Sequence, residues 1–251
     1  MMVFYVKLAG QLIEIHAQYE MARKKLSNYI IRPDNLSLVS FTVAVSQQDM
    51  LYEEAEMQED IWKENDMYFS RNPQLLEYAA IQRKIAIALV EYNTLVFHGS
   101  AISTNGSGVI MVGRSGIGKS ERTRIWINEF PGSFVINGDK PFIRIMDNKA
   151  YAYGNPWCGK EGWNTNSSAP LNDILIIERV DEINGENNSI CKISFSDAFS
   201  TIIQQVYIPN EYMAMRKVLC LLKELDGMVD FYRFRSDLSS EGIIMAYNTI
   251  M

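Results

Sequence analysis

The sequence predicts an α/β chain built around a mixed β-sheet, and three observations support this prediction. An apolar run at 109–112 has the composition of a buried strand, a glycine-rich loop follows it, and 121–130 has the composition of a helix. Strand-like runs joined by turn signals such as Asn105-Gly106 indicate β-hairpins. Helical stretches follow these strands towards the C-terminus, as expected where helices cover a sheet.

The N-terminal part has its own mixture of strands and helices. The expected elements are a hairpin about Ala9-Gly10, a helix at 17–30, a strand at 36–45 and a helix from Pro73 to about Val90. The acidic stretch 49–60 fits either a solvated helix face or an acidic docking surface. We expect 1–72 to form an N-terminal α+β extension and 73–251 to form the main domain, or the whole chain to be one continuous domain.

The second part of the chain reads as a series of hairpins followed by helices. The strand at 95–104 is expected to pair with 109–112, so the strand that enters the glycine-rich loop belongs to a hairpin. The remaining expected elements are strands at 133–136, 142–146, 150–153, 174–179 and 190–195 and helices at 196–207, 211–225 and 239–247.

The glycine-rich loop matches the phosphate-binding motif G-x-x-x-x-G-K-[ST], in the strand–loop–helix context that the motif requires. Its glycines let the backbone approach an anion, and its N–H groups and the helix N-terminus attract phosphate oxygens. Lys119 is expected to reach the terminal phosphates and Ser120 to offer its hydroxyl to Mg²⁺. The alternative is a glycine turn that carries Lys-Ser by chance. The residues expected to bind nucleotide are Gly113, Arg114, Ser115, Gly116, Ile117, Gly118, Lys119, Ser120 and Glu121.

Composition narrows the class of protein. Of 251 residues, 47% are apolar and 22% charged, which is ordinary for a globular protein, and the net charge of −6 gives no sign of a nucleic-acid-binding surface. Three isolated cysteines argue against a disulfide framework and a structural zinc site. No apolar run approaches a membrane span, and the first residues lack the basic segment of a signal peptide. We therefore expect a cytoplasmic protein without nucleic-acid or membrane partners.

Three segments together resemble the catalytic domain of the HPr kinase/phosphorylases, which share a fold with the PEP carboxykinases. They are Phe97-His98-Gly99, the P-loop followed by Glu121, and Asn137-Gly138-Asp139. In that family a His-Gly pair lies on the strand before the P-loop, the loop reads G-x-S-G-x-G-K-S-E, and an Asp pair ends the next strand. The resemblance covers 95–142, is compatible in element order to about 195, and gives no match over 1–90.

The resemblance implies a P-loop kinase that uses ATP and Mg²⁺ to phosphorylate a Ser/Thr hydroxyl of a protein, peptide or small-molecule acceptor. It implies catalytic roles for Lys119, His98 and Asp139, and Mg²⁺ ligation by Ser120 and Asp139. The family's acid pair corresponds to Gly138-Asp139, so Asp139 could serve as base or as metal ligand, or be a turn residue. His98 could contact the γ-phosphate or be a hydrogen-bonded strand histidine. HPr kinases form hexamers, so the resemblance is compatible with a homo-oligomer.

The segment 154–164 is rich in glycine and tryptophan and has no periodicity. Such a loop is expected either to close over a bound nucleotide or to pack both tryptophans against the sheet. The residues expected on the acceptor side, for positive charge and an apolar face, are Lys140, Arg144, Trp157 and Lys160.

Two other functions stay open from the sequence. The missing second acid fits a catalytically weak nucleotide-binding module with a regulatory or peptide-recognition role. The other hypothesis is a carboxykinase-like enzyme that acts on a carboxylated small molecule. The chain is short for such an enzyme, and the metal-binding His and Lys positions expected of it are not evident.

Overall fold

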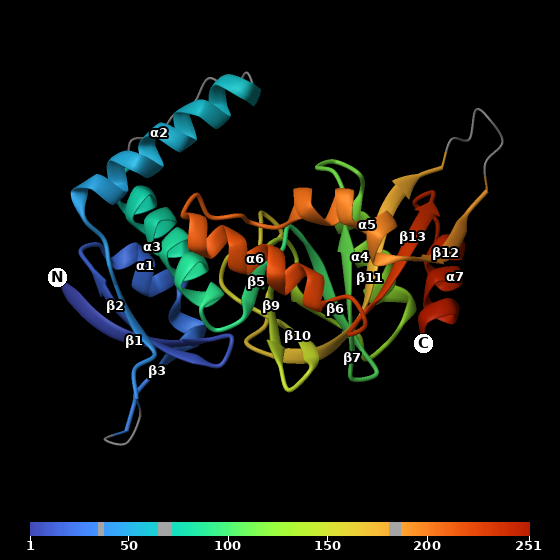
Figure 1. The fold of residues 1–251 in the computed structure, drawn as a ribbon, viewed down its shortest axis with the longest axis horizontal. Coiled ribbons are helices and arrows are strands. Elements are labelled where there is room, and N and C mark those ends of the chain that lie inside the picture. Colours follow the sequence, from blue (N-terminus) through green and yellow to red (C-terminus); the bar gives the residue numbers. More distant parts are fainter. Residues whose placement is uncertain (35–37, 65–71, 181–186) are drawn as a thin grey trace. The chain divides into compact units, whose positions relative to one another are not determined.

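The computed structural model describes residues 1–34, 38–64, 72–180 and 187–251. It divides the chain into two compact units, Met1–Leu89 and Val90–Met251, each with its own sheet (Figure 1). No described helix is both long enough and apolar enough to cross a lipid bilayer.

The first unit combines a four-stranded sheet with helices. Ala9 and Gly10 both have positive φ and close the β1–β2 hairpin, which confirms that prediction. The helix expected at 17–30 is shorter, because Ala17 still belongs to a strand and a 3₁₀ turn, Ser27–Tyr29, follows Leu26. The elements are β1 (Met2–Leu8), β2 (Gln11–Ala17), α1 (Glu20–Lys25), β3 (Ile30–Ile31), β4 (Phe41–Ala44), α2 (Gln47–Glu64) and α3 (Pro73–Val90), with strand order β3-β1-β2-β4.

Helix α3 is tied to the first unit by charged side chains. The buried Glu77 carboxylate accepts hydrogen bonds from the backbone N–H groups of Gln18 and Tyr19 at 2.5 and 3.0 Å. Arg83 on α3 donates to Glu53 on α2 at 2.5 Å. These contacts explain why the compact units divide at Leu89/Val90 rather than at the expected boundary, 72/73.

The second unit holds a mixed sheet, which confirms the predicted fold class at that level. In the described part of the unit the sheet has nine strands. Seven of them follow the order β5-β9-β10-β11-β7-β6-β8, while β13 pairs with β11 and β12 pairs with β13. Strands β7, β11 and β13 are parallel, and the other pairs are antiparallel. The strands are β5 (Thr94–Val96), β6 (Gly99–Thr104), β7 (Ser107–Val112), β8 (Phe134–Asn137), β9 (Phe142–Met146), β10 (Lys149–Tyr153), β11 (Ser168–Arg179), β12 (Ser189–Ile193) and β13 (Asp230–Ser236).

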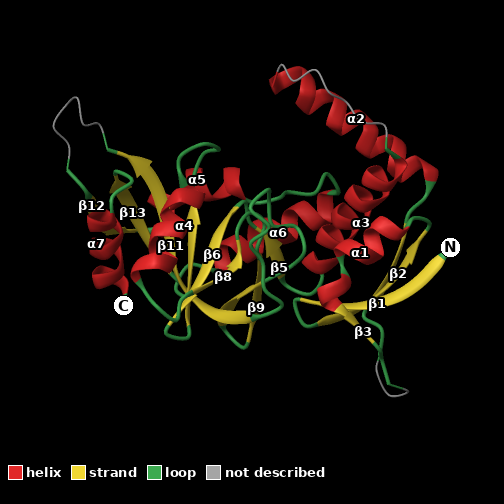
Figure 2. Cartoon of the chain, turned by 180° about the vertical axis from the view of Figure 1, so that it is seen from behind, coloured by secondary structure: helices red, strands yellow, loops and turns green. Residues whose placement is uncertain are grey.

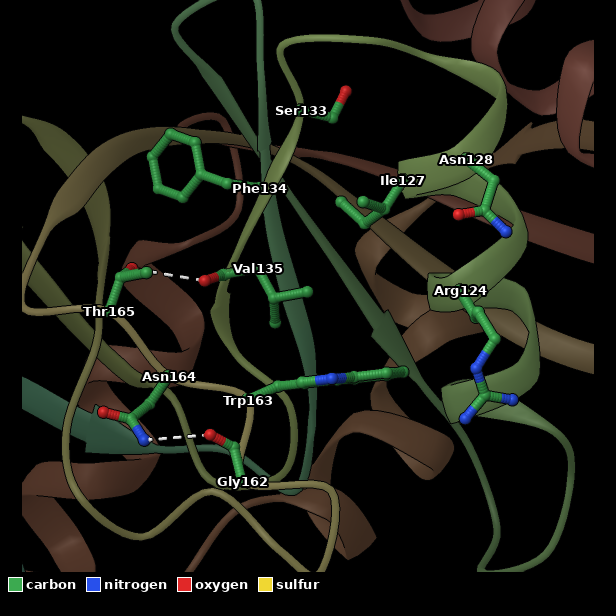
Figure 3. A pocket seen from close by; sticks show the side chains of 10 residues that line it. All are labelled: Arg124, Ile127, Asn128, Ser133, Phe134, Val135, Gly162, Trp163, Asn164 and Thr165. Carbon is green, nitrogen blue, oxygen red and sulfur yellow. Dashed lines mark hydrogen bonds between the residues drawn. The ribbon is translucent and has the colours of Figure 1, made fainter.

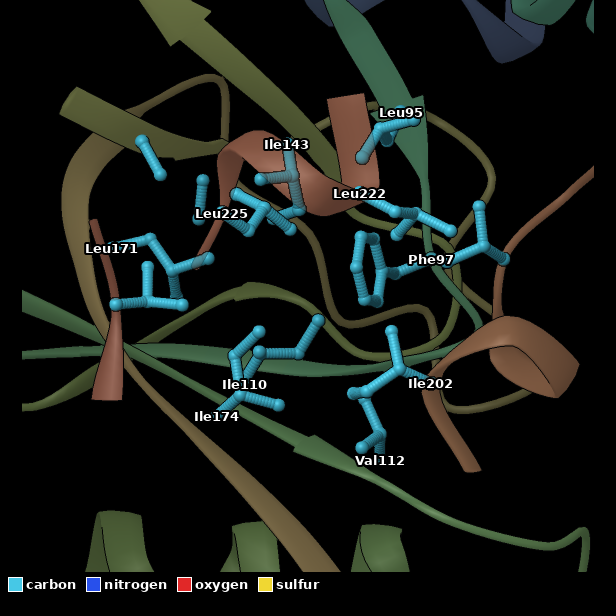
Figure 4. Packing of buried hydrophobic residues seen from close by; sticks show 14 of the residues in the cluster. Leu95, Phe97, Ile110, Val112, Ile143, Leu171, Ile174, Ile202, Leu222 and Leu225 are labelled. Atoms are coloured by element: carbon cyan, nitrogen blue, oxygen red, sulfur yellow. The ribbon is translucent and has the colours of Figure 1, made fainter. Parts of the chain in front are cut away.

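Helices cover both faces of this sheet, so its central strands are apolar on both sides. Ile110 and Val112 of β7 pack with α5 (Phe195–Ile202) and α6 (Tyr212–Glu224), as Figure 4 shows. Val109 and Met111 point to the other face and pack with α4 (Lys119–Glu129) and α7 (Ser240–Ile250). Helices α4 and α7 lie side by side over that face (Figures 1 and 2). The P-loop strand is therefore fixed at the centre of three layers.

Several features of the second unit differ from the sequence-based expectations: β11 begins at Ser168 rather than at 174, and α5 ends at Ile202 rather than at 207. The strand expected at 95–104 is interrupted at His98, because the Phe97 and His98 N–H groups donate to Pro141 and Gln205 outside the β6–β7 pairing. Strand β13 was not predicted at all, and it completes the parallel group beside β11. The hairpin of β6 and β7, the β9–β10 hairpin and the Ser239 cap of α7 are confirmed.

We expect Asp173→Asn to stabilise the protein most at neutral pH. Burial within β11, and then the adjacent Asp230 carboxylate, raise the pKa of Asp173 from 3.8 to about 6. Because the pKa of Asp173 is raised, its stabilising contribution is fully present below the unfolded pKa of 3.8 and is lost as pH rises through about 6. Asparagine does not ionise, so the variant avoids this loss of folding free energy, which is on the order of 2–3 kcal/mol.

Urea denaturation near pH 4.5 and near pH 7.5 measures this difference. Glu224→Gln, at an exposed position near the end of α6, is the matched control. If both substitutions respond equally to pH, the prediction is wrong.

Candidate functional site

Five strand ends meet at one edge of the second sheet. The parallel strands β7, β11 and β13 all finish there, since Val112 is level with Ile176 and Ser236 with Arg179. The antiparallel β6 starts at this edge, with Gly99 opposite Val112, and β8 ends there. Ligands of open α/β sheets bind outside the carboxyl ends of parallel strands. A functional site is therefore expected at this edge of the sheet.

The P-loop leaves β7 at this edge and enters α4. Gly118 has φ +96°, and a Cβ there would lie 2.6 Å from Arg122 Nη1, so the position requires glycine. The Lys119 ammonium donates to the carbonyls of Gly113 at 2.9 Å and Arg114 at 3.4 Å. The Lys119 side chain therefore folds back over the glycine-rich loop that precedes it in the sequence. The Ser120 hydroxyl forms no hydrogen bond with the described residues.

Arg122 braces the loop from inside. Its side chain is buried, with Nη1 donating to the carbonyls of Ile117 at 2.8 Å and Gly118 at 3.2 Å. Nε donates to Ser236 Oγ at 2.8 Å, and Nη2 donates to the Ser236 carbonyl. Burial lowers the pKa of the Arg122 guanidinium, and the carboxylate of Asp237 opposes that shift. The last turn of the P-loop is thereby held to the end of β13.

His98 and Asp139 lie next to each other beside the loop. His98 Nε2 is 3.5 Å from Asp139 Oδ1, and both side chains are partly exposed. The Gly99 N–H donates to the Asp139 carbonyl at 2.8 Å, which fixes the start of β6 against the turn after β8. The sequence-predicted pair therefore meets in space, although His98 lies in the break between β5 and β6 and Asp139 in the turn after β8.

The charges at this site favour a neutral imidazole. Burial lowers the pKa of His98, Lys119 and Lys140 lower it further, and Asp139 opposes them. Burial also lowers the pKa of Lys119, again opposed by Asp139. Near neutral pH the His98–Asp139 contact is consequently not an ion pair, and the Asp139 carboxylate acts on the Lys119 ammonium.

Asn137 sets the conformation of the turn that carries Asp139. Its buried Oδ1 accepts hydrogen bonds from the N–H groups of Asp139 at 2.9 Å and Lys140 at 2.7 Å. Its Nδ2 donates to the carbonyls of Asn155 at 3.0 Å and Trp157 at 3.2 Å. Both ends of one amide are thus used to fasten the Asp139 turn to the glycine-tryptophan loop.

The two tryptophans of that loop have different surroundings. Trp157 is buried and packs against Phe142, with ring centroids 6.0 Å apart. Trp163 is half-buried, and its carbonyl accepts from the Gly138 N–H at 2.9 Å. A Cβ at Gly138 would lie 3.3 Å from Trp163 Cβ. The loop therefore lies directly against the turn that holds Asp139.

The remaining sequence-predicted acceptor residues are placed differently. Lys140 and Lys160 are exposed, and Lys140 follows Asp139 directly. Arg144 lies within β9, level with Thr94 and Tyr151 of the neighbouring strands. At the loop tip Arg114 and Ser115 are exposed. Roles for these side chains in acceptor binding stay predictions.

Several residues at this edge were missed from the sequence. Asn155 and Arg122 act through contacts between distant segments, so no local pattern could show them. Arg179 donates from Nη2 to the Gly116 carbonyl at 2.7 Å, and with Asp237 it lines a cavity of about 350 Å³ beside the loop. One wall of this cavity is the end of β13, for which the alternation of Tyr232 and Phe234 with Arg233 and Arg235 was the sequence signal.

Sequence comparison gives no relative for this chain. No family model and no curated protein matches it. A solved structure, the Hpr(Ser) kinase/phosphatase from Coxiella burnetii, aligns over 61% of this chain and 93% of its own, with 10% identity and a TM-score of 0.35. A TM-score this low does not establish a shared fold, so function must be judged from the site itself.

We expect Asn137→Ala to lower the free energy of unfolding by about 2–4 kcal/mol, because the backbone groups that Asn137 hydrogen-bonds lose their partner in a buried place. Urea denaturation followed by tryptophan fluorescence measures the change. Asn172→Ala is the matched control, because among the described residues the exposed Asn172 amide donates only to Ser107 Oγ, at 2.7 Å. Equal losses in the two variants would contradict the role assigned to Asn137.

Proposed function

We propose that this chain is an ATP-dependent phosphotransferase of the HPr kinase-like type, with a PEP carboxykinase-like arrangement around the P-loop, acting on a hydroxyl of a protein, peptide or small-molecule acceptor. The observation that carries the proposal is the meeting of the P-loop, His98 and Asp139 at one edge of the sheet. Phosphoryl transfer needs a phosphate cradle, a cation at the terminal phosphates and a group that orients the acceptor. These three parts are supplied by the loop amides, Lys119 and Asp139.

The transfer proceeds with one bond formed and one broken. The acceptor oxygen attacks the γ-phosphorus, the bond from that phosphorus to the β–γ bridging oxygen breaks, and ADP leaves. The acceptor proton goes to the Asp139 carboxylate, while neutral His98 hydrogen-bonds the acceptor or the transferring group. Lys119 turns from the Gly113 carbonyl towards the phosphates when nucleotide is present.

The residues present fit a magnesium nucleotide. Ser120 has a hydroxyl without a partner in the described chain, and Asp139 supplies a carboxylate, so these two would hold Mg²⁺ with the phosphates. The ion would neutralise charge on the γ-phosphate. Among the described residues no cluster of three or more His, Cys, Asp and Glu side chains could hold a metal by itself. Mg²⁺ would therefore enter with the nucleotide.

A second candidate is a nucleotide-binding regulatory or peptide-recognition module with weak turnover. Gly138 favours it, since glycine stands where the HPr kinases carry an acid and the Asp139 turn therefore has one carboxylate rather than two. Turnover separates the candidates: the enzyme transfers the labelled γ-phosphate of ATP, whereas the module binds Mg-ATP and leaves it intact.

We expect Lys119→Ala to weaken Mg-ATP binding about 10- to 100-fold and to abolish transfer, because charge-assisted contacts to the terminal phosphates are lost. Calorimetry measures the affinity. Lys149→Ala, at an exposed position on β10, controls for the loss of one positive charge. Undiminished Mg-ATP binding by the Lys119 variant would refute the P-loop assignment.

We expect Asp139→Asn to keep nucleotide affinity within about tenfold and to lose most transfer, because the loop amides provide most of the cradle and Asp139 acts only through the acceptor or Mg²⁺. Release or transfer of the labelled γ-phosphate is the measurement. Asp147→Asn in the exposed β9–β10 turn is the control. Transfer at the wild-type rate would reduce Asp139 to a turn residue.

A further inference from the structure

A second cavity lies between α4 and the glycine-tryptophan loop, and we call it the α4–Trp163 pocket. It has a volume of about 420 Å³, within the usual range of ligand pockets. Figure 3 shows Ile127, Val135, Trp163 and Arg124 around a common space, with the indole extending from the loop towards the helix. The lining residues are Arg124, Ile127, Asn128, Ser133, Phe134, Val135, Gly162, Trp163, Asn164 and Thr165.

The wall of this pocket is built on the strand end that positions Asp139. Trp163 accepts the Gly138 N–H, and Asn164 forms a β-bridge with Asn137. The Thr165 N–H donates to the Ile136 carbonyl at 3.0 Å. Each of these contacts lies within three residues of Asp139 along the chain. A group bound in the pocket is therefore held at a fixed distance from the proposed base.

The lining has one apolar face and one cation. Ile127, Phe134, Val135 and Trp163 supply the apolar surface. The Arg124 guanidinium lies 5.4 Å from the centroid of the Trp163 ring and is the single charged group among the described lining residues. No carboxylate in the described part of the chain pairs with it. A large apolar group next to an anion complements such a surface.

The position of the pocket favours a polypeptide occupant. None of His98, Lys119 and Asp139 lines it, so a group bound there is not the reacting group and must be joined to it by a chain. Strand β8 is the last in the described sheet order, and residues 163–165 hydrogen-bond to its outer edge.

We infer that the α4–Trp163 pocket anchors the acceptor: it binds a large apolar side chain of a polypeptide, pairs Arg124 with a neighbouring carboxylate, and so delivers a nearby hydroxyl to Asp139. The inference rests on the phosphotransfer proposed above and adds the class of acceptor. It also gives separate roles to the two tryptophans, since Trp163 forms the pocket and buried Trp157 supports the loop.

Binding is tested without any transfer. The chain has four tryptophans, and Trp163→Phe identifies the Trp163 indole N–H resonance in an NMR spectrum. The probes are acetylated, amidated peptides with one serine and a Phe-Glu pair placed two to five residues from it, on either side. We expect a member of this set to shift the Trp163 resonance, and replacing its Phe-Glu by Ala-Glu or Phe-Gln to weaken binding at least fivefold.

Substitutions at Arg124 test the charge. Arg124→Gln should weaken binding of the Phe-Glu peptide at least fivefold and remove its advantage over the Phe-Gln peptide, whereas Arg124→Lys should keep most of it. Arg216→Gln, at an exposed position on α6 across the sheet, should change nothing. If no Phe-Glu peptide binds, or if Arg124→Gln binds it as wild type does, the inference is overturned. Phenylacetate binding as tightly as the peptide would make this a small-molecule site and also overturn it.

Transfer from labelled Mg-ATP to the same peptides separates the two proposals. Binding that depends on Arg124 and Trp163, with no transfer to any peptide, supports the pocket as a peptide site and refutes the phosphotransferase. Transfer that is insensitive to Arg124→Gln and Trp163→Ala supports the phosphotransferase and refutes the pocket. We expect both substitutions to raise the KM for the peptide at least fivefold and to leave Mg-ATP affinity unchanged.

Discussion

The site depends on one buried amide, the side chain of Asn137. Its oxygen holds the N–H groups of Asp139 and Lys140, and its nitrogen holds the carbonyls of Asn155 and Trp157. An amide can do this because it combines an acceptor with two lone pairs and a donor with two protons. An aspartate or a leucine of similar size would leave backbone groups without partners in a buried place. One residue thus couples the carboxylate turn to the loop that shapes the neighbouring pocket.

Arg122 plays the corresponding part on the other side of the P-loop. Its guanidinium binds backbone carbonyls and a hydroxyl, with no carboxylate of the described residues in direct contact, so the charge stabilises the carbonyl ends of the loop and of β13. A buried cation is costly unless its donors are satisfied, and here each of the three guanidinium nitrogens donates a hydrogen bond. The loop is consequently preorganised from both sides: Asn137 orders the turn that carries Asp139, and Arg122 orders the turn beside the cavity lined by Arg179 and Asp237.

Sequence patterns correctly predicted the elements that are determined by interactions between residues close in the sequence. The strand–loop–helix unit, the Asn105-Gly106 hairpin and the Ser239 cap follow from turn chemistry and short-range hydrogen bonds, and all three are present. The β13 strand was missed although Tyr232 and Phe234 alternate with Arg233 and Arg235, and it is completed by its pairing with β11. The contact of Arg124 with Trp163 joins a helix to a loop that is distant in the sequence, and the spacing of residues along the sequence does not predict such contacts.

Gly138 lies between the single acid of the Asp139 turn and the loop that forms the wall of the pocket. A Cβ at this position would lie 3.3 Å from Trp163 Cβ and 3.5 Å from the Cys158 carbonyl. A side chain here would therefore require a small shift of Trp163. The glycine allows the loop to lie against the Asp139 turn without this shift, and it leaves the turn with one acid. The Asp139 turn thus presents one carboxylate with neutral His98 beside it, and a cavity with its own lining lies against the same turn.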